Sequence, residues 1–148
     1  MKTETPLDKL RELAQQEVDD AATLLGQIRQ SHVQAQQQLD MLLGYEDDYR
    51  VQLQQSMGSG INAANWYNYQ QFIKTLELAI EQHRKQLAVW AQRLEQAMKT
   101  WQAKRQRLNA FETLKERAAQ ELLVRENRRD QKLMDEFAQR SSLRKLNP

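Results

Sequence analysis

One short stretch, residues 56–62, constrains this chain most, because it is the one plausible point of reversal in the interior. Two of the four glycines lie here, between long segments rich in good helix formers. Gly58 and Gly60 can take a positive φ and end a helix without steric cost. Asn62 can cap the next helix by accepting from a nearby backbone N–H. We interpret the stretch as the turn of a helical hairpin; a flexible link between independent helices is the alternative.

On both sides of the turn, apolar residues recur at alternating spacings of three and four, which is typical of a coiled-coil seam. The first ladder contains Leu10, Ala14, Val18, Ala21, Leu25, Ile28, His32, Ala35, Leu39, Leu42, Tyr49 and Leu53. The second contains Ile73, Leu76, Ile80, His83, Leu87, Trp90, Leu94, Ala97, Trp101, Lys104, Leu108, Phe111, Lys115, Ala118 and Leu122.

These ladders predict an all-α fold, a long antiparallel two-helix coiled coil with an overhanging C-terminal helix. We expect a single extended domain over residues 1–148, with helices at 6–57 and 62–140, a turn at 58–61 and a frayed tail at 141–148. Residues at the same level then have numbers that sum to 121. Gly26 and Gly44 interrupt the first helix, where they would permit close approach or bending.

Composition supports an extended helical protein: charged residues make up 28% of the chain, and there are four glycines, two prolines and no cysteine. Residues 1–60 carry a net charge of −5 and residues 61–148 a net charge of +7. This asymmetry favours pairing within the chain over pairing of two first helices. No apolar run is long enough for a transmembrane segment and no signal pattern opens the chain, so we expect a cytoplasmic protein.

No pattern of catalytic residues is present, and we expect no enzymatic activity, no cofactor and no metal site. His32 and His83 both lie at seam positions without further ligands at helical spacing, so we interpret them as polar residues of the seam. The basic overhang of the second helix could bind nucleic acid. Against this, acidic residues alternate with its positive charges, and aromatic residues are nearly absent there. A nucleic-acid-binding helical arm and a self-associating structural coiled coil stay open as alternatives.

Near the turn, the apolar band is wider than one seam requires. A second line of residues follows each seam at the same level, so the two lines can form one composite patch across the hairpin. Tyrosine, leucine and phenylalanine with a charged rim are typical of a protein-binding surface. A thicker core near the turn explains the same residues.

Three strings resemble the FliJ family of flagellar export proteins: Trp66 to Ile73 after the turn, Glu17 to Ala22, and Met134 to Arg140. The resemblance covers nearly the whole chain and agrees in length and turn position. It implies a hairpin similar to the central stalk subunit of rotary ATPases, acting in flagellar type III secretion, in flagellar assembly and motility.

The family resemblance also implies partners. The terminal end would enter the ring of the hexameric flagellar export ATPase, in a region that contains Arg117, Arg125, Arg128 and Arg129. The rest of the stalk would contact the cytoplasmic domain of the export gate membrane protein, which places the protein peripherally at the inner-membrane export apparatus. A link to export chaperones is implied as well. Gate-binding residues carry over as Gln38, Leu42, Tyr45, Tyr49, Phe72, Leu76, Ala79 and His83, which are the residues of the composite patch.

Overall fold

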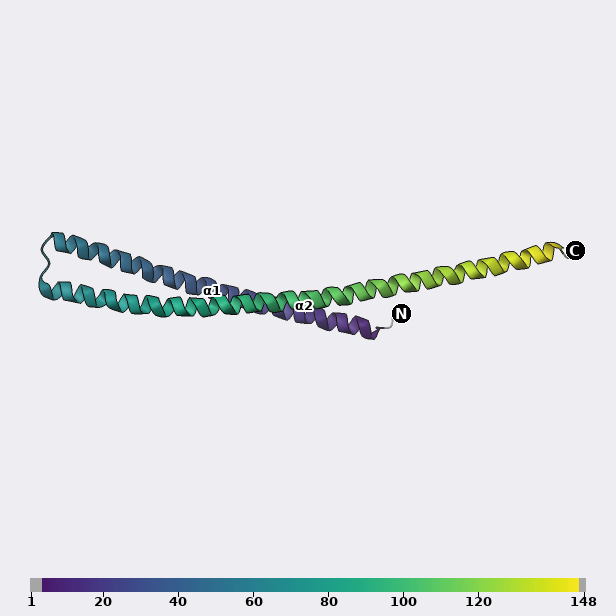
Figure 1. The fold of residues 1–148 in the computed structure, drawn as a ribbon, viewed down its shortest axis with the longest axis horizontal. Helices are drawn as coiled ribbons and strands as arrows, with labels where there is room; N and C mark the ends of the chain where they lie inside the picture. The colour runs from purple at the N-terminus through teal and green to yellow at the C-terminus, as the bar shows by residue number, and fades with distance from the viewer. Residues whose placement is uncertain (1–3, 147–148) are drawn as a thin grey trace. The chain divides into compact units, whose positions relative to one another are not determined.

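The computed structural model describes residues 4–146 and divides into two compact units. The turn unit spans Val18–Ala103, and the terminal unit combines the chain up to Glu17 with the chain from Lys104 onward. Two helices account for the fold, α1 (Pro6–Gly58) and α2 (Ala63–Leu146) (Figure 1). No strand occurs in residues 4–146. The predicted all-α helical hairpin is therefore confirmed.

The turn lies where it was predicted, but one glycine adopts a positive φ there, whereas the sequence suggested two. Gly60 has a φ of 83°, in the left-handed region that glycine adopts without steric cost. Gly58 is the last residue of α1 and has no positive φ, so the expectation for this residue was wrong. Helix α1 thus ends one residue later than expected, and α2 begins one residue later, at Ala63.

Polar groups close both helix ends at the turn. The Ser59 backbone N–H donates to the Gln55 carbonyl at 3.2 Å, and the Ser59 hydroxyl donates to the same oxygen at 2.9 Å. At the start of α2, Asn62 Oδ1 accepts from the Asn65 backbone N–H at 2.8 Å. This is the N-cap that the sequence predicts, and it satisfies a donor that the helix itself leaves unpaired.

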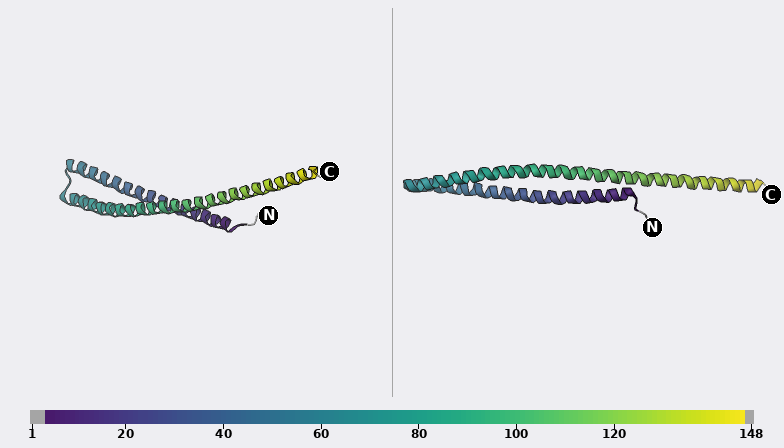
Figure 2. Two further views of the ribbon diagram at one scale, coloured as in Figure 1. Left: turned by 45° about the vertical axis from the view of Figure 1, so that its right-hand side comes forward. Right: turned by 90° about the horizontal axis from the view of Figure 1, so that it is seen from below.

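The core of the turn unit follows the two predicted ladders. Within this unit, Figure 2 shows the segments of α1 and α2 running side by side. The buried apolar side chains all lie at ladder positions: Val18, Leu25, Ala35, Leu39, Leu53, Ile73, Leu76, Ile80 and Ala97. Burial of one stripe per helix is what holds such long helices in water, since propensity alone is too weak.

The core of the terminal unit is smaller. Ala14 and Leu108 are buried there, whereas Leu10 is exposed. The predicted ladder in α2 loses its burial after Phe111, and every residue from 113 to 146 except Ser141 is exposed. The second ladder therefore contributes to a packed seam only as far as α1 is present to cover it.

The C-terminal end of α2 differs from the expectation. The helix continues to Leu146, so residues 141–146 are helical rather than frayed, and residues 147–148 lie outside the described part. Arg144 and Lys145 in the last turn explain the extension, because cations stabilise the negative end of the helix dipole.

Candidate interaction surfaces

An aromatic cluster joins α1 to α2 in the turn unit. The ring centroids of Tyr49 and Phe72 lie 4.3 Å apart, and the rings are inclined by 33°. Tyr49 also approaches Tyr69, with ring centroids 6.3 Å apart at 60°. Aromatic pairs at these separations stabilise a contact by about 0.5–1.5 kcal/mol beyond the area they bury. The cluster thus fixes the register of the two helices near the turn.

Sequence reasoning placed Tyr49 and Phe72 in the composite patch but assigned no role to Tyr69. This residue lies three positions before Phe72, a spacing that puts both side chains on one helix face. Helical spacing from Phe72 is therefore the signal that could have identified it.

The eight residues of the composite patch differ in exposure. Gln38 is exposed, as are Tyr45 at 49% and Phe72 at 41%. Leu76 is only 8% exposed and belongs to the core. The remaining four are half-buried: Leu42, Tyr49, Ala79 and His83. Tyr45 and Phe72 are thus the members of the set that present a large ring to solvent.

Arg50 supplies charge beside this surface. Its Nη2 lies 2.7 Å from Glu77 Oε1 on α2, and its Nε lies 3.5 Å from Glu46 Oε1 one turn earlier on α1. Because the side chains of Arg50 and Glu77 are about half exposed, this ion pair contributes only about 0–1 kcal/mol to stability. Its geometry does place a charged rim next to the aromatic rings.

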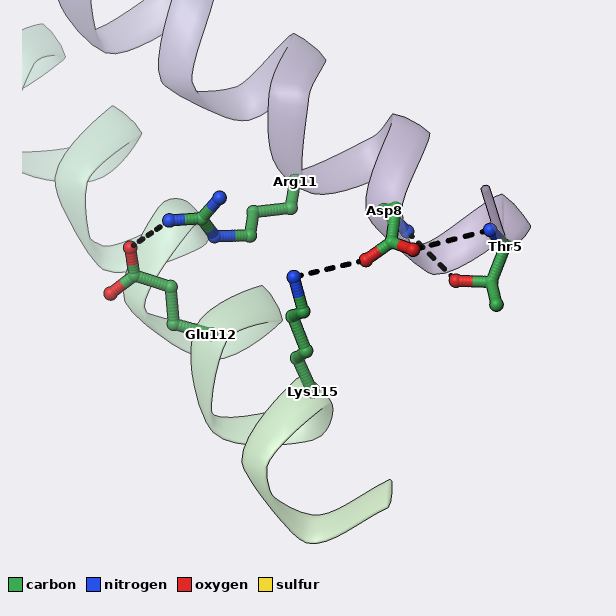
Figure 3. Close-up of polar contacts among 5 residues, drawn as sticks. All are labelled: Thr5, Asp8, Arg11, Glu112 and Lys115. Atoms are coloured by element: carbon green, nitrogen blue, oxygen red, sulfur yellow. Dashed lines mark hydrogen bonds and ion pairs between the residues drawn. The ribbon is translucent and has the colours of Figure 1, made fainter. Parts of the chain in front are cut away.

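In the terminal unit, polar contacts hold the start of α1 against α2 (Figure 3). The Thr5 backbone N–H donates to Asp8 Oδ2 at 3.2 Å, and the Asp8 backbone N–H donates to Thr5 Oγ1 at 3.2 Å. This reciprocal pair is a capping box with aspartate in the third helical position. Lys115 Nζ lies 3.1 Å from Asp8 Oδ1, so the same carboxylate ties α1 to α2.

The pKa of Asp8 lies below its ordinary value of 3.8. The largest cause is the hydrogen bond from the Thr5 backbone, followed by the contact with Lys115; both stabilise the ionised carboxylate. Asp8 is therefore charged throughout the physiological pH range.

Further ion pairs cross the terminal unit. Arg11 Nη2 lies 3.4 Å from Glu112 Oε1 (Figure 3). Glu17 Oε2 lies 3.3 Å from Lys104 Nζ and 3.8 Å from Arg107 Nη1. Glu112 lies on α2 whereas Glu17 lies on α1, so both helices supply acidic partners. These ion pairs therefore depend on the individual residues that face each other, and not on the net charge of each helix. Like the 49–72 contact, the 17–104 pair has residue numbers that sum to 121, the predicted register.

The four arginines proposed for the ATPase-ring region all lie on the exposed part of α2 in the terminal unit. Arg117, Arg125 and Arg128 border one shallow hollow with Glu121 and Val124, and Arg129 lies outside it. The same part of the helix exposes large apolar side chains: Leu122, Leu123, Val124, Leu133, Met134 and Phe137. This mixture of arginine and exposed apolar side chains is typical of a protein-binding helix.

Residues 4–146 contain no cluster of three or more potential metal ligands. None of their helices has the length and apolar character needed to cross a membrane. His32 and His83 are half-buried along the seam.

Comparison with known proteins gives one consistent result. A family model described as flagellar FliJ protein matches residues 1–147. The flagellar FliJ protein of Salmonella typhi is 54% identical over 139 residues, which cover 94% of this chain and 95% of that protein. The flagellar FliJ protein of Escherichia coli (strain K12) is 52% identical over 139 residues, with the same coverage of both chains.

Proposed function

Because the chain belongs to the flagellar FliJ family, we propose that it is a non-enzymatic stalk component of the flagellar type III export apparatus. In this role its terminal unit inserts into the ring of the hexameric export ATPase, and its turn unit contacts the cytoplasmic domain of the export gate. By bridging the export ATPase and the export gate, the protein couples ATPase activity and proton motive force to substrate export. The same stalk assists the recycling of empty export chaperones.

The observation that carries the ATPase half of the proposal is the exposed helix from residue 113 to residue 146. A helix whose side chains are exposed at all of these positions except Ser141, among them Met134 and Phe137, has an apolar surface available for a partner. Its arginines add donors that recognise carboxylates on such a partner.

The gate half rests on the exposed rings of Tyr45 and Phe72 beside the Arg50–Glu77 pair. Aromatic anchors with a polar rim are the usual composition of binding hot spots. On this proposal the protein acts at the cytoplasmic face of the inner membrane, held there by its partners.

A pull-down with purified export ATPase and the purified gate domain tests both halves. We expect the full chain to bind both partners and a chain lacking residues 118–148 to bind only the gate domain. Binding of neither partner by the full chain would contradict the proposal, and so would undiminished ATPase binding by the shortened chain. A salt-dependent mobility shift on RNA or DNA, without binding of either partner, would favour the nucleic-acid alternative.

The gate surface is tested by comparing two substitutions. Tyr45→Ala removes an exposed ring, and we expect it to weaken gate binding by about 1–3 kcal/mol with little change in thermal melting. Leu25→Ala removes a buried side chain outside the composite patch, and we expect it to lower the free energy of unfolding by about 2–5 kcal/mol.

Gate affinity by calorimetry, measured beside the melting temperature of each variant, separates the two effects. If Tyr45→Ala lowered melting and affinity in proportion, the ring would belong to the core rather than to a binding surface.

A further inference from the structure

The chain surrounding the turn contains no charged residue. Residues 51–73 form a stretch of 23 residues without Asp, Glu, Lys or Arg, although 28% of the whole chain is charged. Arg50 and Lys74 mark its limits. The next longest uncharged run in the chain, residues 30–39, has ten residues, so a hairpin in water does not require an uncharged stretch as long as 51–73.

Large apolar side chains are nevertheless exposed in this stretch. Trp66 is 42% exposed and Tyr67 is 59% exposed, and Val51 and Met57 are exposed as well. An isolated exposed apolar residue needs no explanation, but several gathered in an uncharged stretch mark an interaction site.

A groove of about 410 Å³ lies at the turn, between the end of α1 and the start of α2. Hydrogen-bonding side chains line it from both helices and from the turn, among them Gln55, Ser56, Ser59 and Asn65. Ile61 and Tyr69 contribute apolar surface to the same groove. Through Tyr69 the groove adjoins the aromatic cluster.

We propose that this turn groove is a second recognition site that binds an extended, uncharged polypeptide segment carrying an aromatic or large apolar residue. Amide and hydroxyl side chains can donate to and accept from the backbone of an extended chain, which has a free N–H and C=O at most residues. Tyr69 supplies rigid contact area at low entropic cost, and the serine, glycine and asparagine residues of the groove supply adaptable hydrogen bonds.

The absence of charge specifies the partner. A charged segment would have to leave water for a groove that offers no countercharge, which is costly. A lipid bilayer fits the groove less well, because its hydrocarbon would leave the amides of Gln55 and Asn65 without hydrogen-bond partners. None of the groove residues belongs to the eight residues proposed for the gate, so this site stands independently of that assignment.

Selection from a phage-displayed library of random twelve-residue peptides tests the proposal on the immobilised full chain. We expect enriched peptides to lack charged residues and to share an aromatic or large apolar position. Their affinity should fall at least tenfold for a Gln55→Lys, Asn65→Lys double variant, which places charge in the groove. A matched control, Gln82→Lys with Gln86→Lys on the exposed face of α2, should bind as the unmodified chain does.

Salt provides a second readout: peptide affinity should change less than twofold between 50 and 500 mM NaCl, since no ion pair forms. If the lysine variant melts early, Gln55→Ala with Asn65→Ala takes its place and should also weaken binding. Enrichment of charged peptides, no enrichment, or equal binding by the groove variants would overturn the proposal. So would sedimentation of the unmodified chain, but not of the groove variant, with phosphatidylcholine vesicles.

Discussion

Asp8 serves two functions in the terminal unit. Its carboxylate accepts from the Thr5 backbone at the start of α1 and pairs with Lys115 of α2, so the cap of one helix is also its link to the other. The lowered pKa of Asp8 means that the folded chain binds its proton more weakly than the unfolded chain does. The stabilisation is therefore present above the ordinary pKa of 3.8 and is lost as pH falls through the lower folded value.

This linkage predicts a local effect of acid at the start of α1. Between pH 5 and pH 3, the first-turn amides of α1 should lose hydrogen-exchange protection in the unmodified chain as Asp8 begins to take up its proton. Asp8→Asn keeps an acceptor for Thr5 but has no proton to gain, so its protection should be lower at neutral pH and less dependent on pH. An NMR titration of the Asp8 carboxyl with its midpoint at or above 3.8 would contradict the assignment.

Thr5→Ala provides the matched control, because it removes the other half of the capping box and leaves the Asp8 carboxylate in place. We expect a loss of about 0.5–2 kcal/mol in the stability of the first turn, the usual cost of removing a helix cap.

At the scale of the helix, Gly26 and Gly44 lie within α1. The expectation that they permit close approach was wrong: beyond the adjacent backbone of α1 itself, a Cβ at either position would have no heavy atom within 4 Å. Gly26→Ala and Gly44→Ala should therefore each raise the free energy of unfolding, by about 0.5–1 kcal/mol, because alanine loses less backbone entropy in a helix. Urea denaturation measures this change, and destabilisation by either alanine would show that the glycine has a packing role.

The packed seam makes a second prediction at this scale. Ile80 is 6% exposed, and Ile80→Ala should lower the free energy of unfolding by about 2–5 kcal/mol. Leu78, two residues earlier on the same helix, is 65% exposed, and Leu78→Ala should change it by no more than about 0.5 kcal/mol. Equal effects of the two substitutions in chemical denaturation would contradict the assignment of the seam.

The helices and their register could be predicted from the sequence because a three–four ladder specifies which face is buried, and a glycine with a following cap specifies where the chain turns. The end of α2 was less predictable, because no packing contact terminates a solvent-exposed helix. Exposure within the composite patch was also harder to infer, since Leu76 lies on both the seam and the flanking line. Periodicity alone cannot decide which of two adjacent lines a partner helix covers.

At the scale of the molecule, α2 continues well beyond the residues that pack against α1. Every described residue from 118 to 146 except Ser141 is exposed, so deleting 118–148 removes no buried side chain of the described part. The deletion should change the free energy of unfolding by no more than about 0.5 kcal/mol while lowering the helical circular-dichroism signal in proportion to the lost residues. A large loss of stability would show that this part of α2 packs against other parts of the chain.

The length of α2 determines how much conformational entropy is lost when a partner binds to its C-terminal part. Fixing the backbone of a disordered residue costs about 1–2 kcal/mol, and a segment that folds on binding bears that cost at the moment of association. Because α2 is helical to Leu146 before any partner is present, association becomes the docking of a preorganised helix. Its heat-capacity change should therefore reflect the buried interface alone, without the additional contribution of coupled folding.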